Sequence, residues 1–169
     1  MPLKLCDFID KLNEWTGKMA GWLILPMCLI VSYDVIMRYL FNRPTIWAWD
    51  INVQLLAAMV VLGGGYALLY DSHIGVDVVV TTLSRRKRVL LELITFLFFF
   101  LSVGTLLFLG TQQAWLAVKI LEKDSSFFAP PVYPIKILIA LGFLLLFLQG
   151  ISKFIRCILA YGSKGGTTN

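Results

Sequence analysis

The apolar run ILIALGFLLLFLQGI at residues 137–151 decides what kind of protein this chain is. It belongs to one of four long apolar stretches, which cover residues 21–40, 47–69, 89–117 and 135–161. Each is long enough for an α-helix to cross a hydrocarbon core of about 30 Å, which takes about 20 residues. The chain is therefore predicted to be an all-α integral membrane protein with four transmembrane helices in a single membrane domain, residues 1–169.

The composition agrees with a lipid environment. Of the 169 residues, 59% are hydrophobic and 15% are charged, and the mean hydropathy is +0.81. A soluble fold of this length needs more polar residues to cover its core. The three cysteines are far apart and match no metal-ligand spacing. The single histidine, His73, excludes bis-histidine haem ligation within one chain.

Two further segments have amphipathic patterns. In residues 1–19, lysines and acidic residues occupy one helical face, and the other face contains Leu5, Phe8, Ile9, Leu12, Trp15 and Met19. This pattern predicts a helix that lies in the membrane interface, with packing on a partner protein as the alternative. A second segment, residues 76–84, precedes the basic run Arg85 to Arg88 and predicts a short interfacial helix between the second and third spans.

Basic residues are concentrated in the N-terminal segment, in the loop after the second span and in the C-terminal segment. The positive-inside rule therefore predicts that both termini are cytoplasmic. The loops at residues 41–46 and 121–134 are then expected to face outward. The first span follows a polar, acid-containing segment without a small-residue cleavage site, so we expect it to remain in the mature protein.

Few charged residues lie within the predicted spans. Asp34 and Arg38 are four residues apart on one helical face and can pair. The pair is interpreted as self-neutralising or as a packing contact, and the alternative is an ion-coupling carboxylate. Asp50 follows Trp47 and Trp49 at the outer start of the second span, where it complements the helix dipole and the tryptophans belong to an aromatic belt.

Several signatures of transport and catalysis are absent from the sequence. We find no pair of interrupted helices and no internal repeat of the kind that builds the core of a secondary transporter. The sequence also has no phosphate-binding glycine loop and no nucleophile–base arrangement. We expect that the chain is not an enzyme and that it binds no metal or cofactor. Gly63, Gly64 and Gly65 are expected to let a neighbouring helix approach closely.

Two motifs point to a known family. The run RYLFNRP at residues 38–44, followed by Trp47 and Asp50, resembles the small membrane subunit of tripartite ATP-independent periplasmic (TRAP) transporters, the DctQ-like family. Gly64 and Gly65 followed by HIGVD at residues 73–77 are similar to a second signature of that family. One departure is that the family often has two adjacent acids after the tryptophan, whereas this chain has Asp50 alone.

The resemblance implies a bacterial inner-membrane, multi-pass subunit without catalytic residues. It would scaffold a large multi-span membrane subunit, which would carry the substrate and sodium sites, and would help to dock a periplasmic solute-binding protein for sodium-coupled uptake of an organic acid. The candidate partner-interface residues are Asp34, Arg38, Arg43, Trp47, Asp50, His73, Asp77, Lys119 and Lys123. The loop at residues 123–131 is either part of the docking surface or a stiff connector.

Two other functions stay open at this point. The chain could be a self-sufficient, proton-coupled four-helix exporter that works as a homodimer, in which case Asp34 or Asp50 would bind protons and cationic drugs. It could also anchor a redox enzyme, which predicts bound haem or quinone. The solitary His73, near the predicted cytoplasmic interface, disfavours haem.

Overall fold

A computed structural model describes residues 2–70 and 85–163, and the regular elements in these ranges are helices. They are α1 (Pro2–Trp22), α2 (Ile24–Tyr39), α3 (Ala48–Leu69), α5 (Arg85–Ile120) and α6 (Tyr133–Ser163). Within the described ranges, four helical stretches are long and apolar enough to cross a membrane: Leu3–Tyr39, Ala48–Leu69, Ile94–Ile120 and Tyr133–Leu159. The predicted all-α, four-span class is confirmed.

The N-terminal helix is not separate from the first span. α1 runs into α2 with a break at Leu23, so Leu3–Tyr39 forms one helical rod of 37 residues. Pro26 explains the break, because it has no N–H to donate to the carbonyl of Trp22 four residues earlier. A rod of this length measures about 55 Å, which exceeds the hydrocarbon core. The second predicted interfacial segment, residues 76–84, lies outside the described residues, and the interfacial position of α1 stays a prediction.

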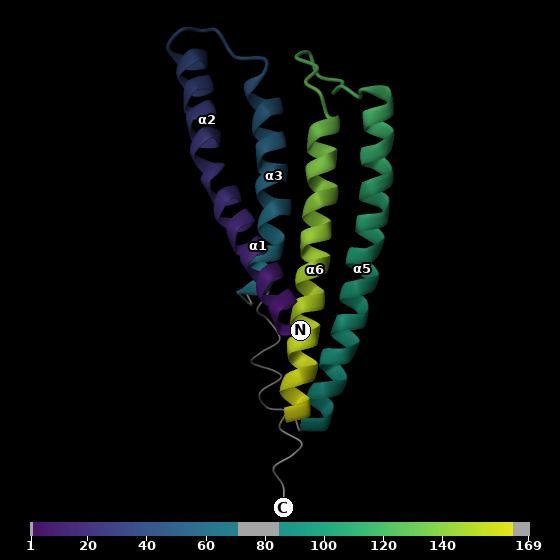
Figure 1. The fold of residues 1–169 in the computed structure, drawn as a ribbon. Helices are drawn as coiled ribbons and strands as arrows, with labels where there is room; N and C mark the ends of the chain where they lie inside the picture. The colour runs from purple at the N-terminus through teal and green to yellow at the C-terminus, as the bar shows by residue number, and fades with distance from the viewer. Residues whose placement is uncertain (1, 71–84, 164–169) are drawn as a thin grey trace, which may run out of the picture.

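The helices form a row in the order α2, α3, α6, α5 (Figure 1). α1 crosses this row at one end, where it contacts both α3 and α6. The loops at residues 40–47 and 121–132 lie at the opposite end of the molecule from the start of α1 and the end of α6. We name these the outer end and the inner end, following the orientation that the basic residues predict.

Small residues make the close contacts inside the row. A Cβ added to Gly142 would overlap Val61, and one added to Gly150 would overlap Phe99. Buried alanines occupy further contact positions: Ala48, Ala58, Ala114, Ala117 and Ala140. This is the packing expected in lipid, where close approach of backbones replaces the hydrophobic effect as the source of helix association.

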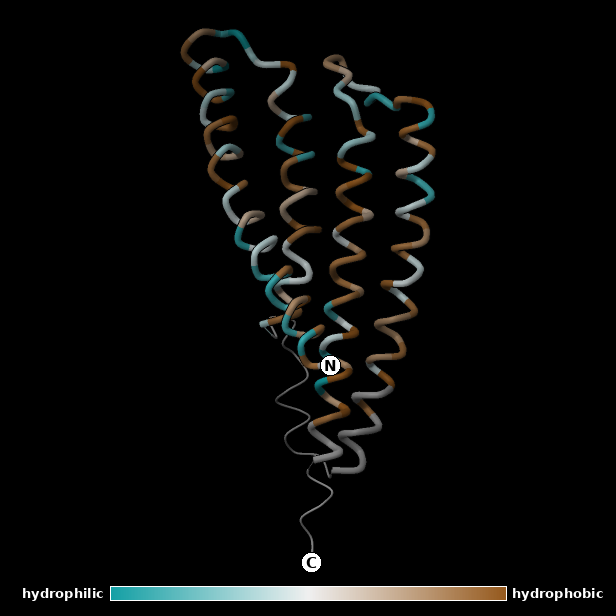
Figure 2. The backbone as a smooth tube through the Cα atoms, viewed as in Figure 1, coloured by the Kyte–Doolittle hydropathy of each residue, from teal (hydrophilic) through white to brown (hydrophobic). Residues whose placement is uncertain are grey.

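Most large apolar side chains face outward from the row. α2 has no buried residue, and Leu29 is 71% exposed. Figure 2 shows apolar residues along α2, α3, α5 and α6, whereas hydrophilic residues gather along α1 and near the ends of the helices. The helices α2, α3, α6 and α5 therefore form a single layer, crossed by α1 at the inner end, with apolar surface available to lipid or to other membrane proteins.

Candidate partner interface

The face by which α1 packs differs from the apolar face that the sequence pattern predicts. The side chains buried on α1 are Cys6, Ile9, Asn13 and Ala20, of which only Ile9 belongs to the predicted apolar face. Other members of that face are more than half exposed: Leu5, Phe8, Trp15 and Met19. α1 therefore docks on its own chain through small and polar residues and leaves its large apolar residues uncovered.

A network of polar side chains joins α1 to α6 at the inner end. We call it the inner polar network, and its members are Asp7, Asp10, Asn13, Gln149, Ser152 and Arg156. Asn13 Nδ2 donates to Gln149 Oε1 (2.8 Å), and Gln149 Nε2 donates to Asp10 Oδ1 (2.8 Å). The Ser152 hydroxyl donates to the same Asp10 oxygen (2.9 Å). Asn13 and Ser152 are fully buried, so these hydrogen bonds are shielded from water.

Arg156 contributes a positive charge to the inner polar network, where it contacts two carboxylates. Its guanidinium donates to Asp7 Oδ1 and to Asp10 Oδ2, each at 2.7 Å. Asn13 meets α3 near the inner end of that helix, and Arg156 lies about two helical turns beyond Gln149 on α6, or roughly 10 Å further along. The charged part of the network therefore sits where the headgroup region is expected, and ions cost less there than at the bilayer centre.

Two glycines allow α1 to approach α3. A Cβ added to Gly17 would overlap the side chain of Tyr66, and one added to Gly65 would overlap Asn13 Oδ1. That oxygen is buried and accepts no conventional hydrogen bond. It lies where a Cβ of residue 65 would stand, so only glycine at this position leaves room for it. Of the three glycines expected to allow close approach, Gly65 does so, whereas a Cβ on Gly63 would meet open space.

Sequence patterns did not reveal the inner polar network. Arg156 belongs to the basic residues of the C-terminal segment, which were interpreted as topology signals, and Asn13 and Gln149 stood out in no motif. A detectable signal was present, because Cys6, Asn13 and Ala20 recur every seven residues along α1 and form a stripe of small and polar residues beside the apolar one.

At the outer end, Asp34 holds the loop at residues 40–47. The backbone N–H of Thr45 donates to Asp34 Oδ1 (3.1 Å), and the Thr45 hydroxyl donates to the same oxygen. Arg38 donates to Asp34 Oδ2 (2.8 Å), so the predicted ion pair is present. The ring of Trp47 stacks on Tyr33, with centroids 6.1 Å apart. Asp34 thus ties α2 to the start of α3.

Asp50 holds the other outer loop in a similar way. This carboxylate, in the first turn of α3, is 9% exposed. It accepts a hydrogen bond from the Ser126 hydroxyl (2.5 Å). Gln54, one turn further along, donates to the carbonyl of Pro131 (3.4 Å). Both outer loops are therefore fastened to spanning helices by a carboxylate.

The remaining candidates are spread over the outer end. Arg43 and Lys123 are exposed on different loops. Lys119 lies over the ring of Trp115, 5.2 Å from its centroid. His73 and Asp77 fall outside the described residues. The structure pairs Asp34 with Arg38 and places Trp47 against the neighbouring Tyr33. Contact of these residues with a partner stays a prediction.

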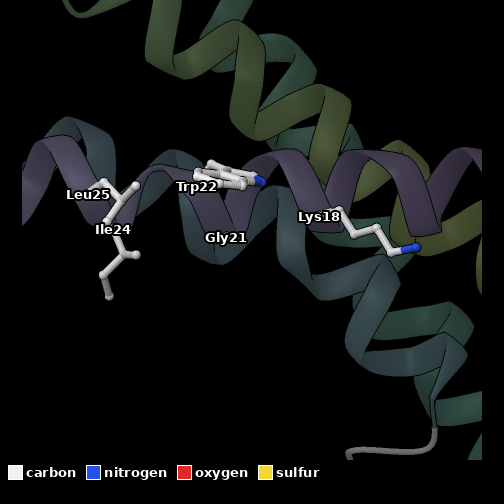
Figure 3. A pocket seen from close by; sticks show the side chains of 5 residues that line it. All are labelled: Lys18, Gly21, Trp22, Ile24 and Leu25. Carbon is white, nitrogen blue, oxygen red and sulfur yellow. The ribbon is translucent and has the colours of Figure 1, made fainter.

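A shallow hollow lies at the break between α1 and α2 (Figure 3). It is lined by Lys18, Gly21, Trp22, Ile24 and Leu25. Lys18 already pairs with Glu14 (2.6 Å), one turn away on the same helix. Across the described ranges, no three histidine, cysteine or acidic side chains gather closely enough to hold a metal ion. The described residues therefore provide surfaces for packing and hydrogen bonding.

Comparison with known proteins bears on the family of this chain. Residues 27–160 match the family model of the DctQ component of tripartite ATP-independent periplasmic transporters. A curated relative, the C4-dicarboxylate TRAP transporter small permease protein DctQ of Vibrio cholerae, is 32% identical over 109 residues. The alignment covers 64% of this chain and 45% of the relative, so the chain spans less than half of that protein. Because the family model covers most of its length, the chain belongs to the DctQ component family of TRAP transporters.

Proposed function

We propose that the chain is the small, non-catalytic membrane subunit of a TRAP-type secondary transporter, which scaffolds the large transport subunit and helps to dock the periplasmic solute-binding protein. Membership of the DctQ family makes it a multi-pass inner-membrane transporter component and not an enzyme. The proposed cargo is an organic acid taken up with sodium. The name of the Vibrio cholerae relative, a C4-dicarboxylate transporter component, supports this cargo class.

The observation that carries the proposal is the open, single-layer arrangement of the helices. Residues of α2 are all at least partly exposed, and large apolar side chains such as Leu29 and Leu97 point away from the row. A layer of this kind has apolar faces on which another membrane protein can pack. A chain that made its own conduit would instead close its helices around a polar path.

The placement of charge supports a scaffold role. The ion pairs between Asp34 and Arg38 and between Asp10 and Arg156 lie near opposite ends of the layer. The Asp10–Arg156 pair joins α1 to α6, whereas the Asp34–Arg38 pair lies within α2. The large subunit is proposed to carry the substrate and sodium sites, and its moving part would slide against a static surface that this layer enlarges. The exposed cations Arg43 and Lys123 and the nearby Lys119 would contribute to docking of the binding protein.

Reconstitution in proteoliposomes tests the proposal. The expected result is sodium-dependent uptake of a C4-dicarboxylate only when this chain, the large subunit and the solute-binding protein are all present. Equal uptake without this chain would overturn the scaffold role. Solute movement by this chain alone would instead support the self-sufficient homodimeric exporter.

A further inference from the structure

The outer loop between α5 and α6 is built as a rigid projection. The backbone N–H of Asp124 donates to the carbonyl of Pro130, and that of Val132 donates to Glu122, each at 2.9 Å. Lys123 and Pro131 form an antiparallel bridge between these two hydrogen bonds. The loop therefore closes on itself like a short hairpin, with residues 125–129 at its tip.

Both roots of the loop are held as well. At the end of α5, Glu122 N–H donates to the carbonyl of Ala117 (2.9 Å) and Leu121 N–H to that of Val118 (3.3 Å). Leu121 has a positive φ of 48°, so the helix ends in a Schellman motif with leucine at the position that usually holds glycine. Glu122 also pairs with Lys136 in the first turn of α6 (2.6 Å).

The tip is tied down through Ser126. Its hydroxyl donates to Asp50 Oδ2 on α3 and accepts a hydrogen bond from the backbone N–H of Ala129 (3.2 Å). The carbonyl of Ser126 accepts a second hydrogen bond from that N–H (3.1 Å). These contacts hold the backbone on both sides of Phe127, whose side chain is 98% exposed.

Phe127 stands beyond the helix ends. It lies midway between the end of α5 at Ile120 and the start of α6 at Tyr133, in the loop that rises above both helices in Figure 1. Aromatic residues of the outer interface, Trp115 and Tyr133, lie within the helices. Lys123, Asp124 and Ser125, next to Phe127 in the loop, are exposed and polar. In the predicted orientation, the exposed phenyl ring therefore lies past the outer ends of α5 and α6 and beside polar residues.

We propose that Phe127 is the apolar anchor by which this chain holds the soluble solute-binding protein. This inference rests on the proposed function and adds a specific contact to it. A large aromatic side chain on a preorganised backbone loses little conformational entropy on binding, and such residues dominate the energetics of protein interfaces. A partner dissolved on the outer side can reach the ring beyond the helix ends, and exposed Lys123 supplies a charged rim beside it.

The test uses the complex of this chain with its large subunit in lipid nanodiscs, together with the solute-binding protein that supports uptake with them. Phe127→Ala should weaken the Kd for the binding protein about tenfold or more, the range of an interface hot spot. Phe127→Trp should restore most of the affinity. Phe98→Ala is the matched control, because Phe98 is also an exposed phenylalanine (63%) but lies in the middle of α5. The Kd of the Phe98→Ala complex for the binding protein should equal the wild-type Kd.

Three outcomes would overturn the inference. The first is an unchanged Kd for Phe127→Ala. The second is loss of the large subunit from the purified Phe127→Ala complex, which would assign the ring to the membrane partner. The third is stronger quenching of tryptophan fluorescence by brominated phospholipids in the Phe127→Trp complex than in the wild-type complex, which would assign the ring to lipid. A fourth result would contradict the proposed docking function itself: a wild-type complex that binds no solute-binding protein. It differs from the three outcomes above because it appears without any change to Phe127.

Discussion

The two halves of the N-terminal helical rod follow opposite packing rules. α1 is the more polar half (Figure 2), yet it buries Cys6, Asn13 and Ala20 against the rest of the chain. α2 is almost entirely apolar, yet it has no buried residue. In water the apolar half would be the one to pack inside. In lipid, apolar side chains gain little by leaving the solvent, so hydrogen bonds and close backbone contact decide which half is buried.

The comparison also separates two kinds of attachment. α1 is held along its length by the inner polar network and by the contacts of Gly17 and Gly65. The polar attachment of α2 is concentrated at its outer end, where Asp34 meets Thr45. We therefore expect substitutions in α1 and its contact residues to affect the fold of this chain, and substitutions on α2 to affect it much less.

The largest expected effect comes from Gly65→Val. The new side chain would occupy the place of Asn13 Oδ1, so α1 could not dock, and the free energy of unfolding should fall by about 3 kcal/mol. The docked state can be followed by oxidative crosslinking of Cys6 in a Ser152→Cys background, because Cys6 Sγ lies 4.0 Å from the Ser152 carbonyl. Gly63→Val is the control, because a Cβ at position 63 meets open space. Equal loss of crosslinking in both variants would contradict the prediction.

Asp10→Ala should have the next largest effect. The carboxylate accepts hydrogen bonds from Gln149, Ser152 and Arg156, and its removal leaves partly buried donors unpaired at a cost of about 2 kcal/mol. Unfolding in mixed micelles of increasing denaturing detergent measures the loss. Asp7→Ala should cost about 0.5 kcal/mol, because its ion pair with Arg156 is largely exposed. The prediction fails if Asp7→Ala is the more destabilising of the two.

A smaller effect is expected at the outer end of α2. Asp34→Ala removes the acceptor for the Thr45 N–H and hydroxyl, which should destabilise the loop locally. Hydrogen exchange of the Thr45 amide should then become faster. Arg38→Ala should leave this amide protected, since it removes only the exposed ion pair. Unchanged exchange in Asp34→Ala would show that the loop is held by other contacts.

The smallest effect is expected for Leu29→Ala on α2. Leu29 is 71% exposed, so its truncation should change the unfolding free energy of the isolated chain by less than about 0.5 kcal/mol. Ile9→Ala on α1, where the side chain is 6% exposed, should cost about 2 kcal/mol. Detergent unfolding of the two variants compares the two halves of the rod directly. Similar losses would remove the distinction between them.

Sequence patterns were sufficient for the class of fold and for several local contacts. The four apolar stretches correspond to helices long enough to span a membrane. The pairing of Asp34 with Arg38 followed from their spacing, because residues four apart share a helical face. Such features depend on neighbours along the chain, and hydropathy and helical periodicity describe those neighbours directly.

Other features needed the arrangement of the helices in space. The tie between Asp50 and Ser126 joins residues on different elements, and no periodicity relates them. The apolar stripe on α1 indicated an amphipathic helix whose apolar face lies in the membrane interface, and contact of that face with lipid stays a prediction. The contact of α1 with its own chain was not indicated, because hydropathy ranks side chains by transfer from water, whereas α1 packs by polar complementarity and backbone proximity.

The sequence by itself determined that residues 2–70 and 85–163 contain four helical stretches long and apolar enough to cross a membrane, because span length and apolar content are set within each segment. Only the tertiary structure decided that these helices form an open row, that Gly65 receives Asn13, and that Phe127 projects from a loop held at both roots. Those outcomes depend on which helix meets which. In lipid that choice rests on a few small and polar contacts between distant segments of the chain.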